Sequence, residues 1–268
     1  MVIVIIGILG AIVAVFIRAP IQGYVDAVAR AEASDEADLA LRRMARDIRL
    51  ALPNSVRVNA AGSAIEFLMT RTGGRYVAVE DDAKSGTALS FTDPNALGFT
   101  VVGSLPQPVL ANDYIAVFNL GVPGADAYEA NSAVMSQVAA PVAANVQAPL
   151  VTLRSNRFVQ ALPMPSPESR FQVVSGAVSY VCEAAPNGGF QLRRYAGYGI
   201  NPAMAVPPAG GQAAVLAARV ATCANVFRSD HVAASRLGLV VITLSLRTRN
   251  LADPAVRLVH QVQIDNTP

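Results

Sequence analysis

Residues 1–17 read MVIVIIGILGAIVAVFI and contain no charged or strongly polar side chain. As a helix this segment would be about 25 Å long, just short of the hydrocarbon core of a bilayer. A cleaved signal peptide is disfavoured, since it needs a basic start and a small-residue cleavage motif, and a terminal core helix is rarely so uniformly apolar. We therefore predict that residues 1–18 form a transmembrane and assembly segment. Its contacts would come from Val2, Ile3, Ile5, Ile6, Ile8, Leu9, Ile12, Val13, Val15 and Phe16.

The helix is expected to continue as an amphipathic rod over residues 19–52. Apolar residues recur there at spacings of three or four, which places them on one stripe of a helix. Pro53 disfavours helical conformation in the residue before it and marks the helix end. Pro20 and Gly23 predict an interruption near the start of the rod, as a kink or local melting. The residues expected to pack on the head are Leu41, Met44, Ile48 and Leu52.

After Pro53 the sequence changes to short β-like runs separated by Gly, Pro, Asn and Asp. Two stretches, residues 125–149 and 201–218, lack such runs and are predicted to be loop insertions. Residues 53–268 are thus expected to form a β-rich head, and the whole chain an α+β fold with the long helix packed on an antiparallel sheet. Strands are predicted at residues 63–70, 75–79, 113–120, 177–183, 190–195, 238–247 and 255–264, the last two as an antiparallel hairpin.

The chain has two cysteines, Cys182 and Cys223. Their wide separation, with no histidine near either, does not suit a zinc site. The membrane segment argued above would place the head in an oxidising compartment, where the two thiols would form a disulfide. Two unrelated buried thiols are the alternative.

The composition and the motifs argue against catalysis. The chain carries 21 basic and 19 acidic side chains, and a net charge of +2 gives no nucleic-acid footprint. It contains no Gly-rich phosphate loop, no paired metal-ligand motif and no nucleophile elbow. We therefore predict that the protein is not an enzyme, with no catalytic, cofactor-binding or metal site and no nucleic-acid partner.

Segments at both ends of the chain resemble a known family, whereas residues from about 97 to 165 carry no such motif. The chain resembles type IV pilins and pseudopilins, and more narrowly the minor pilin O family of the mannose-sensitive haemagglutinin (MSHA) pilus biogenesis system. The segments are VIVIIGILGAIVAVFI (2–17), FIRAPIQGYVDAVARAEASDEADLALRRMARDIRLALPNSVRV (16–58), FQVVSGAVSYVCE (171–183), LRRYAGYGI (192–200), GLVVITLSL (238–246) and LVHQVQIDNTP (258–268).

The start of the sequence departs from the pattern of that family. Such pilins begin with a short basic leader, a processing site for the prepilin peptidase and an early glutamate, which by register would all lie upstream of Met1. We expect a misplaced start; a chain that the peptidase cannot process is the alternative. The family's glutamate pairs with the N-terminus of a neighbouring subunit, and no residue is assigned to that role here.

The resemblance implies a minor pilin-like subunit of an MSHA-type pilus, which inserts its N-terminal helix into the filament core. Its partners would be major and minor pilin subunits, inner-membrane lipid, the pilus assembly platform and, with a leader, the prepilin peptidase. The implied location is single-pass in the bacterial inner membrane with the head in the periplasm, and extracellular after assembly. The alternatives are a minor pseudopilin of a type II secretion system and a membrane-tethered periplasmic binding or adhesion protein.

Overall fold

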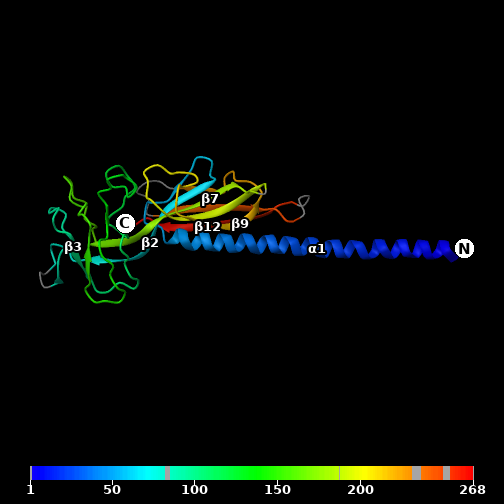
Figure 1. Cartoon of the computed structure of the whole chain (residues 1–268), viewed down its shortest axis with the longest axis horizontal. Helices are drawn as coiled ribbons and strands as arrows, with labels where there is room; N and C mark the ends of the chain where they lie inside the picture. Colours follow the sequence, from blue (N-terminus) through cyan, green and yellow to red (C-terminus); the bar gives the residue numbers. More distant parts are fainter. Residues whose placement is uncertain (1, 82–84, 187, 231–236, 250–253, 268) are drawn as a thin grey trace.

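The computed structural model describes residues 2–81, 85–186, 188–230, 237–249 and 254–267, and Figure 1 shows them as a long rod carrying a β-rich head. The rod is the one helix of the described residues, α1 (Val2–Arg49). The strands are β1 (Arg57–Val58), β2 (Ala64–Tyr76), β3 (Gly98–Val102), β4 (Tyr114–Ala116), β5 (Met135–Gln137), β6 (Leu150–Thr152), β7 (Arg170–Ala184), β8 (Phe190–Tyr198), β9 (Gln212–Val220), β10 (Phe227–Asp230), β11 (Leu237–Leu246) and β12 (Val256–Asp265).

α1 is continuous over its 48 residues, including Pro20 and Gly23. The interruption predicted there is wrong. Proline removes one helical hydrogen bond and glycine has a low helix propensity, but both effects are local, and long helical stretches continue on both sides. The helix ends three residues before Leu52, since the chain then bonds to β2. The amide of Leu52 donates to the carbonyl of Leu68 at 2.7 Å, and the amide of Thr70 donates to the carbonyl of Leu50 at 2.7 Å.

The strands form an antiparallel sheet in the order β10-β11-β9-β8-β7-β2-β3-β6, with β12 on β11 and β4 between β5 and β7. β2 and β7 are the longest strands and pair with each other from Ala64↔Val181 to Arg75↔Arg170. They connect two parts of the head. Among the described residues, the proximal lobe (53–70, 175–186, 188–230, 237–249 and 254–267) lies along α1, and the distal lobe (71–81 and 85–174) lies beyond the end of α1 (Figure 1).

The core of the proximal lobe lies between α1 and the sheet. One face of the helix is buried from Ala33 to Ile48, against side chains such as Phe67, Tyr180 and Leu244. The predicted packing residues Leu41, Met44, Ile48 and Leu52 are all buried. The predicted hairpin is also present, with β11 and β12 paired from Leu237↔Asp265 to Leu246↔Val256.

The distal lobe has a separate aromatic core. The rings of Phe99 and Phe171 meet edge to face, with centroids 5.2 Å apart, and Tyr76 and Phe158 are buried in the same cluster. The predicted insertion at residues 125–149 lies here and is irregular apart from β5.

The second predicted insertion, residues 201–218, is wrong in its C-terminal half, where β9 begins at Gln212. The run is rich in alanine, which is a poor strand former and gives no alternating pattern. Pairing with β8, from Phe190↔Val220 to Ala196↔Gln212, holds it extended, and Ala217 and Val220 point into the core.

The predicted fold class needs two corrections. The described chain is mainly antiparallel β-sheet, with twelve strands and a single helix that packs on part of the sheet, rather than a balanced α+β fold. In addition, no helix within the described residues is long and apolar enough to cross a membrane. That finding contradicts both the predicted transmembrane segment and the single-pass inner-membrane location inferred from it. The physical reason lies in the apolar run before Arg18, which falls short of the roughly 20 residues that a bilayer core requires.

Candidate functional site

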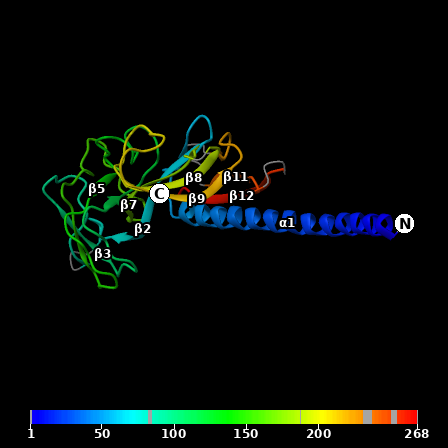
Figure 2. The ribbon, with the colours of Figure 1, turned by 45° about the vertical axis from the view of Figure 1, so that its right-hand side comes forward.

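The most unusual surface of the molecule is the first part of α1, which extends away from the head (Figures 1 and 2). We call residues 2–32 the projecting segment. The head covers little of it, because continuous burial of the helix begins at Ala33. Its exposed apolar side chains include Val2, Val4, Ile5, Ile6, Ile21, Tyr24, Val25 and Val28.

Three of the predicted assembly residues, Val2, Ile5 and Ile6, are between 56% and 69% exposed. The others also belong to α1, but their side chains lie outside the described part of the structure: Ile3, Ile8, Leu9, Ile12, Val13, Val15 and Phe16. Exposure of branched apolar side chains to water is energetically unfavourable. Isolated exposed apolar residues are common on protein surfaces, whereas a continuous row of them is not. The projecting segment therefore has the character of a contact surface.

Two carboxylates of α1 fix the helix to the proximal lobe. The Glu36 carboxylate accepts hydrogen bonds from the amide of Ala218 at 2.7 Å and from the guanidinium of Arg219 at 2.9 Å. The Asp47 carboxylate accepts bonds from the Tyr180 hydroxyl at 2.7 Å and from Nε of Arg194 at 2.8 Å. These contacts fix which face of α1 is turned toward the sheet.

The Asp47 contact also perturbs Tyr180. Burial raises the pKa of the Tyr180 phenol, and its hydrogen bond to Asp47 raises it further. The phenol therefore stays neutral and donates to the carboxylate at all physiological pH values. This pairing is structural in character, because both groups are enclosed between the helix and the sheet.

Cys182 and Cys223 form a disulfide with a Cα–Cα distance of 5.3 Å, as predicted. Cys182 lies in β7 and Cys223 follows β9, so the bond joins two parts of the proximal lobe. The closed loop contains β8 and β9. The disulfide thus fixes the base of the sheet region that packs on α1.

A buried polar network lies on the opposite face of the sheet. Glu66 has a side chain that is 3% exposed and accepts from Arg57 at 3.0 Å through Nε. Its second oxygen accepts from the hydroxyls of Ser179 and Tyr198, each at 3.2 Å. The Arg57 guanidinium also stacks on the ring of Tyr128, 3.7 Å from the centroid. All oxygens of Glu66 are occupied, which indicates a structural role for this carboxylate.

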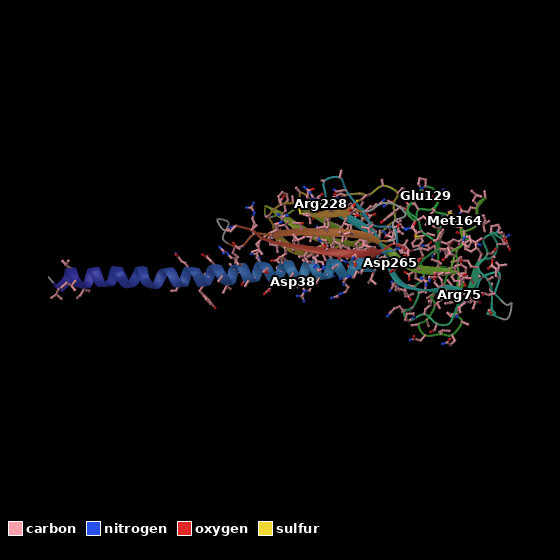
Figure 3. All side chains as sticks on the ribbon, turned by 180° about the vertical axis from the view of Figure 1, so that it is seen from behind. Asp38, Arg75, Glu129, Met164, Arg228 and Asp265 are labelled. Carbon is pink, nitrogen blue, oxygen red and sulfur yellow. A yellow bond between two sulfur atoms is a disulfide. The ribbon has the colours of Figure 1, made fainter. Side chains whose placement is uncertain are left out.

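The distal lobe carries a cleft of about 370 Å³, which the sequence analysis did not identify. Arg154 and Arg157 contribute guanidinium groups to its lining, and Glu129 contributes a carboxylate; Figure 3 marks Glu129 on this lobe. Its lining residues come from β4, β5 and separate loops, so no contiguous motif could have revealed it. No group of three or more His, Cys, Asp or Glu side chains suited to a metal ion occurs among the described residues.

Compared with known protein families, with curated proteins and with solved structures, the chain shows no significant match.

Proposed function

We propose that this chain is a filament subunit of the type IV pilin class, which joins its neighbours through the projecting segment of α1. The observation that carries the proposal is the division of α1 into two parts. From Ala33 onward one face of α1 is buried on the sheet, whereas the apolar side chains of the projecting segment that the structure describes, such as Ile5, Ile21 and Val25, are exposed.

Helix packing between subunits would supply that cover. A Val or Ile side chain contributes about 1.5–3 kcal/mol when it moves from full exposure to full burial. Ile5, Ile6, Ile21 and Val25 are each more than half exposed, so burial of these side chains between neighbouring helices favours association strongly. The head would remain outside the bundle because it begins only beyond the projecting segment.

The more specific form of the proposal is a minor subunit of an MSHA-type pilus. Its support is the resemblance of residues 16–58 and of the C-terminal segments to that family of minor pilins. The partners would then be the major and minor pilins of the same filament. A minor pseudopilin of a type II secretion system presents the same helix physics and is the alternative within this class.

The test is photo-crosslinking in the native cells. A photoreactive amino acid replaces Val25, which is 56% exposed on the projecting segment, and sheared filaments are collected after illumination. The matched control places the same amino acid at Val79, which is 73% exposed and lies in the distal lobe. We expect adducts with pilin subunits from position 25 in the filament fraction, and few or none from position 79.

Crosslinks to type II secretion pseudopilins would select the alternative within the class. A chain that never enters the filament fraction and gives no adduct from position 25 would rule out the filament proposal.

A second candidate function is ligand binding by the distal lobe, favoured by its cleft. Arg157 has no charged partner among the described residues, and Arg154 contacts Asn112 through one nitrogen. Arginine guanidinium groups bind carboxylates in a fork geometry, so an acidic sugar suits the cleft. Binding of glucuronic acid measured by calorimetry, lost in Arg157→Ala and absent for neutral mannose, would support this function; no binding by the wild type would exclude it for this sugar.

A further inference from the structure

The face of α1 that points away from the head carries a regular row of side chains. These residues follow one another at spacings of three or four, so they lie on one stripe along the helix. Leu39, at the middle of the row, is 70% exposed, and Leu50 is 46% exposed. We call this row the outward stripe: Val28, Glu32, Asp35, Leu39, Arg43 and Arg46 of α1, with Leu50 directly after the end of the helix.

The order of residues in the outward stripe is symmetric about Leu39. Two acids precede it, two bases follow it at the same distances, and an apolar residue lies at each end. Read in the opposite direction, the row has the same spacing with each charge replaced by its opposite. Such a row is complementary to a second copy of itself that runs antiparallel.

The charges of the stripe are largely available for such a contact. Within the described residues, no ion pair is formed by Asp35, Arg43 or Arg46, whereas Glu32 pairs with Arg249 at 3.2 Å and is still 45% exposed. The neighbouring pair Arg42 and Asp38, with an N–O distance of 2.7 Å, is already closed within the helix. Asp35, Arg43 and Arg46 are therefore available for contact with a second copy.

We propose that two copies of this chain pair through their outward stripes, as antiparallel helices related by a two-fold axis at Leu39. Asp35 of each copy faces Arg43 of the other, and the two Leu39 side chains pack on each other. Glu32 and Arg46 face each other at the two ends of the contact. A two-fold interface of this kind uses the same surface on both copies.

The shape of the head restricts this pair. The distal lobe extends to both sides of the line of α1 (Figures 1 and 2), so the helix of a second copy cannot continue straight past its end. The two helices therefore cross at an angle, which is common in helix packing. The contact is short and charge-rich, so the dimer is weak and dissociates as salt is added. It does not depend on the proposed filament function.

Charge exchange tests this arrangement in the purified full-length chain. The variants Asp35→Arg and Arg43→Asp each reverse one charge of the facing pair. Because the dimer is two-fold symmetric, each variant places like charges opposite each other at two positions, which should weaken dimerisation about tenfold or more. The double exchange D35R/R43D restores opposite charges in the antiparallel pair and should restore the wild-type dimer. Sedimentation equilibrium at low and at physiological salt measures the dissociation constants.

The matched control is Arg228→Asp. Arg228 is exposed and lies on the side of the head away from α1 (Figure 3), so its reversal should leave the dimer unchanged. All the reversed side chains on α1 are exposed, and an unchanged melting temperature will show that the variants fold. A monomeric wild type at low salt, or a double exchange as weak as its single components, would overturn the proposal.

Disulfide trapping tests the direction of the helices. A Leu39→Cys chain should form a crosslinked dimer on mild oxidation, because the two-fold axis passes between these residues. A parallel pair staggered by three helical turns would instead link a Val28→Cys chain to a Leu39→Cys chain. Preferential formation of that mixed product would overturn the antiparallel arrangement.

Discussion

Glu66 shows how a charged residue can be buried at the centre of this sheet. Its carboxylate faces Arg57 and two hydroxyls on the side of the sheet away from α1. A charge in such a place is stable only while its partners remain, since a lone buried ion loses its hydration without compensation. The network therefore depends on all its members.

We predict that Glu66→Ala lowers the free energy of unfolding by about 1–3 kcal/mol, because it removes the shared acceptor of the Ser179 and Tyr198 hydroxyls, while Arg57 keeps its bonds to the carbonyls of Asn201 and Pro202. Urea denaturation measures the change. The matched control is Glu168→Ala, which removes an ion pair with Arg170 whose two side chains are 66% and 58% exposed. That variant should change stability by less than about 1 kcal/mol. Equal effects of the two substitutions would contradict the structural role of Glu66.

Tyr180 should make the proximal lobe less stable at alkaline pH. Burial, with the Asp47 hydrogen bond, raises the phenol pKa above 10.0 in the folded chain, so the phenol ionises first in the unfolded chain. Its contribution is fully present below pH 10 and is lost as pH rises above that value. Each such group lowers the free energy of unfolding by up to about 1.4 kcal/mol per pH unit there. Tyr180→Phe should show a shallower fall between pH 10 and 11 in urea denaturation; an unchanged slope would contradict this assignment.

At the scale of elements, the packing of the helix on the sheet could be predicted because it depends on the local spacing of apolar residues along the helix. Met44 and Ile48 repeat at the helical period and are buried, and β12 alternates in the same way, with Val262 and Ile264 inside. β3, β5 and β6 could not be predicted, since they are three to five residues long and exist through pairing with distant partners. The distal cleft depends on the same long-range arrangement.

The N-terminal half of α1 was harder to interpret than the rest of the helix. A uniformly apolar run has no preferred side, so its sequence does not distinguish contact with lipid from contact with other helices. The structure shows a helical rod there, with the side chains of Val2, Ile5 and Ile6 exposed. In contrast, the predicted disulfide is present, although the membrane segment from which an oxidising compartment was inferred is contradicted.

The two faces of α1 should respond differently to truncation. Met44→Ala should lower the free energy of unfolding by about 2–5 kcal/mol, because Met44 is fully buried and its loss leaves a cavity. Leu39→Ala is the matched control on the same helix, since Leu39 is 70% exposed, and it should change stability by about 0.5 kcal/mol or less. Thermal denaturation of the two variants in parallel measures both. Similar losses would mean that Leu39 is covered by the folded chain.

At the scale of the whole molecule, the chain divides into a rod and a head that differ in how they are stabilised. The head contains a separate hydrophobic core in each lobe and a further cluster where the lobes join, around Leu68 and Val174. Its C-terminal end is held by Asn54, whose backbone amide donates to the Asn266 side chain at 3.2 Å. The projecting segment has helical hydrogen bonds but few tertiary contacts. Isolated helices are marginally stable in water, so this segment should open far more often than the rest.

We predict a step in amide hydrogen exchange along α1 of the monomeric protein. Residues 21–30 should exchange within seconds to minutes, whereas residues 37–48, packed on the sheet, should be protected at least a hundredfold more, roughly in proportion to their greater opening free energy. Mass spectrometry of peptides from these two ranges provides the measurement. Uniform protection along α1 in a verified monomer would show that the projecting segment is stabilised by something other than tertiary packing.

The continuity of β2 and β7 through both lobes also has a mechanical consequence. These two strands connect the lobes and lie roughly along the length of the molecule (Figure 1). If the distal lobe were pulled away from the helix, the tension would run along the covalent backbones of β2 and β7, because each strand spans both lobes, and the hydrogen bonds between them would carry little of the load. The head is thereby suited to transmit tension from its tip to α1.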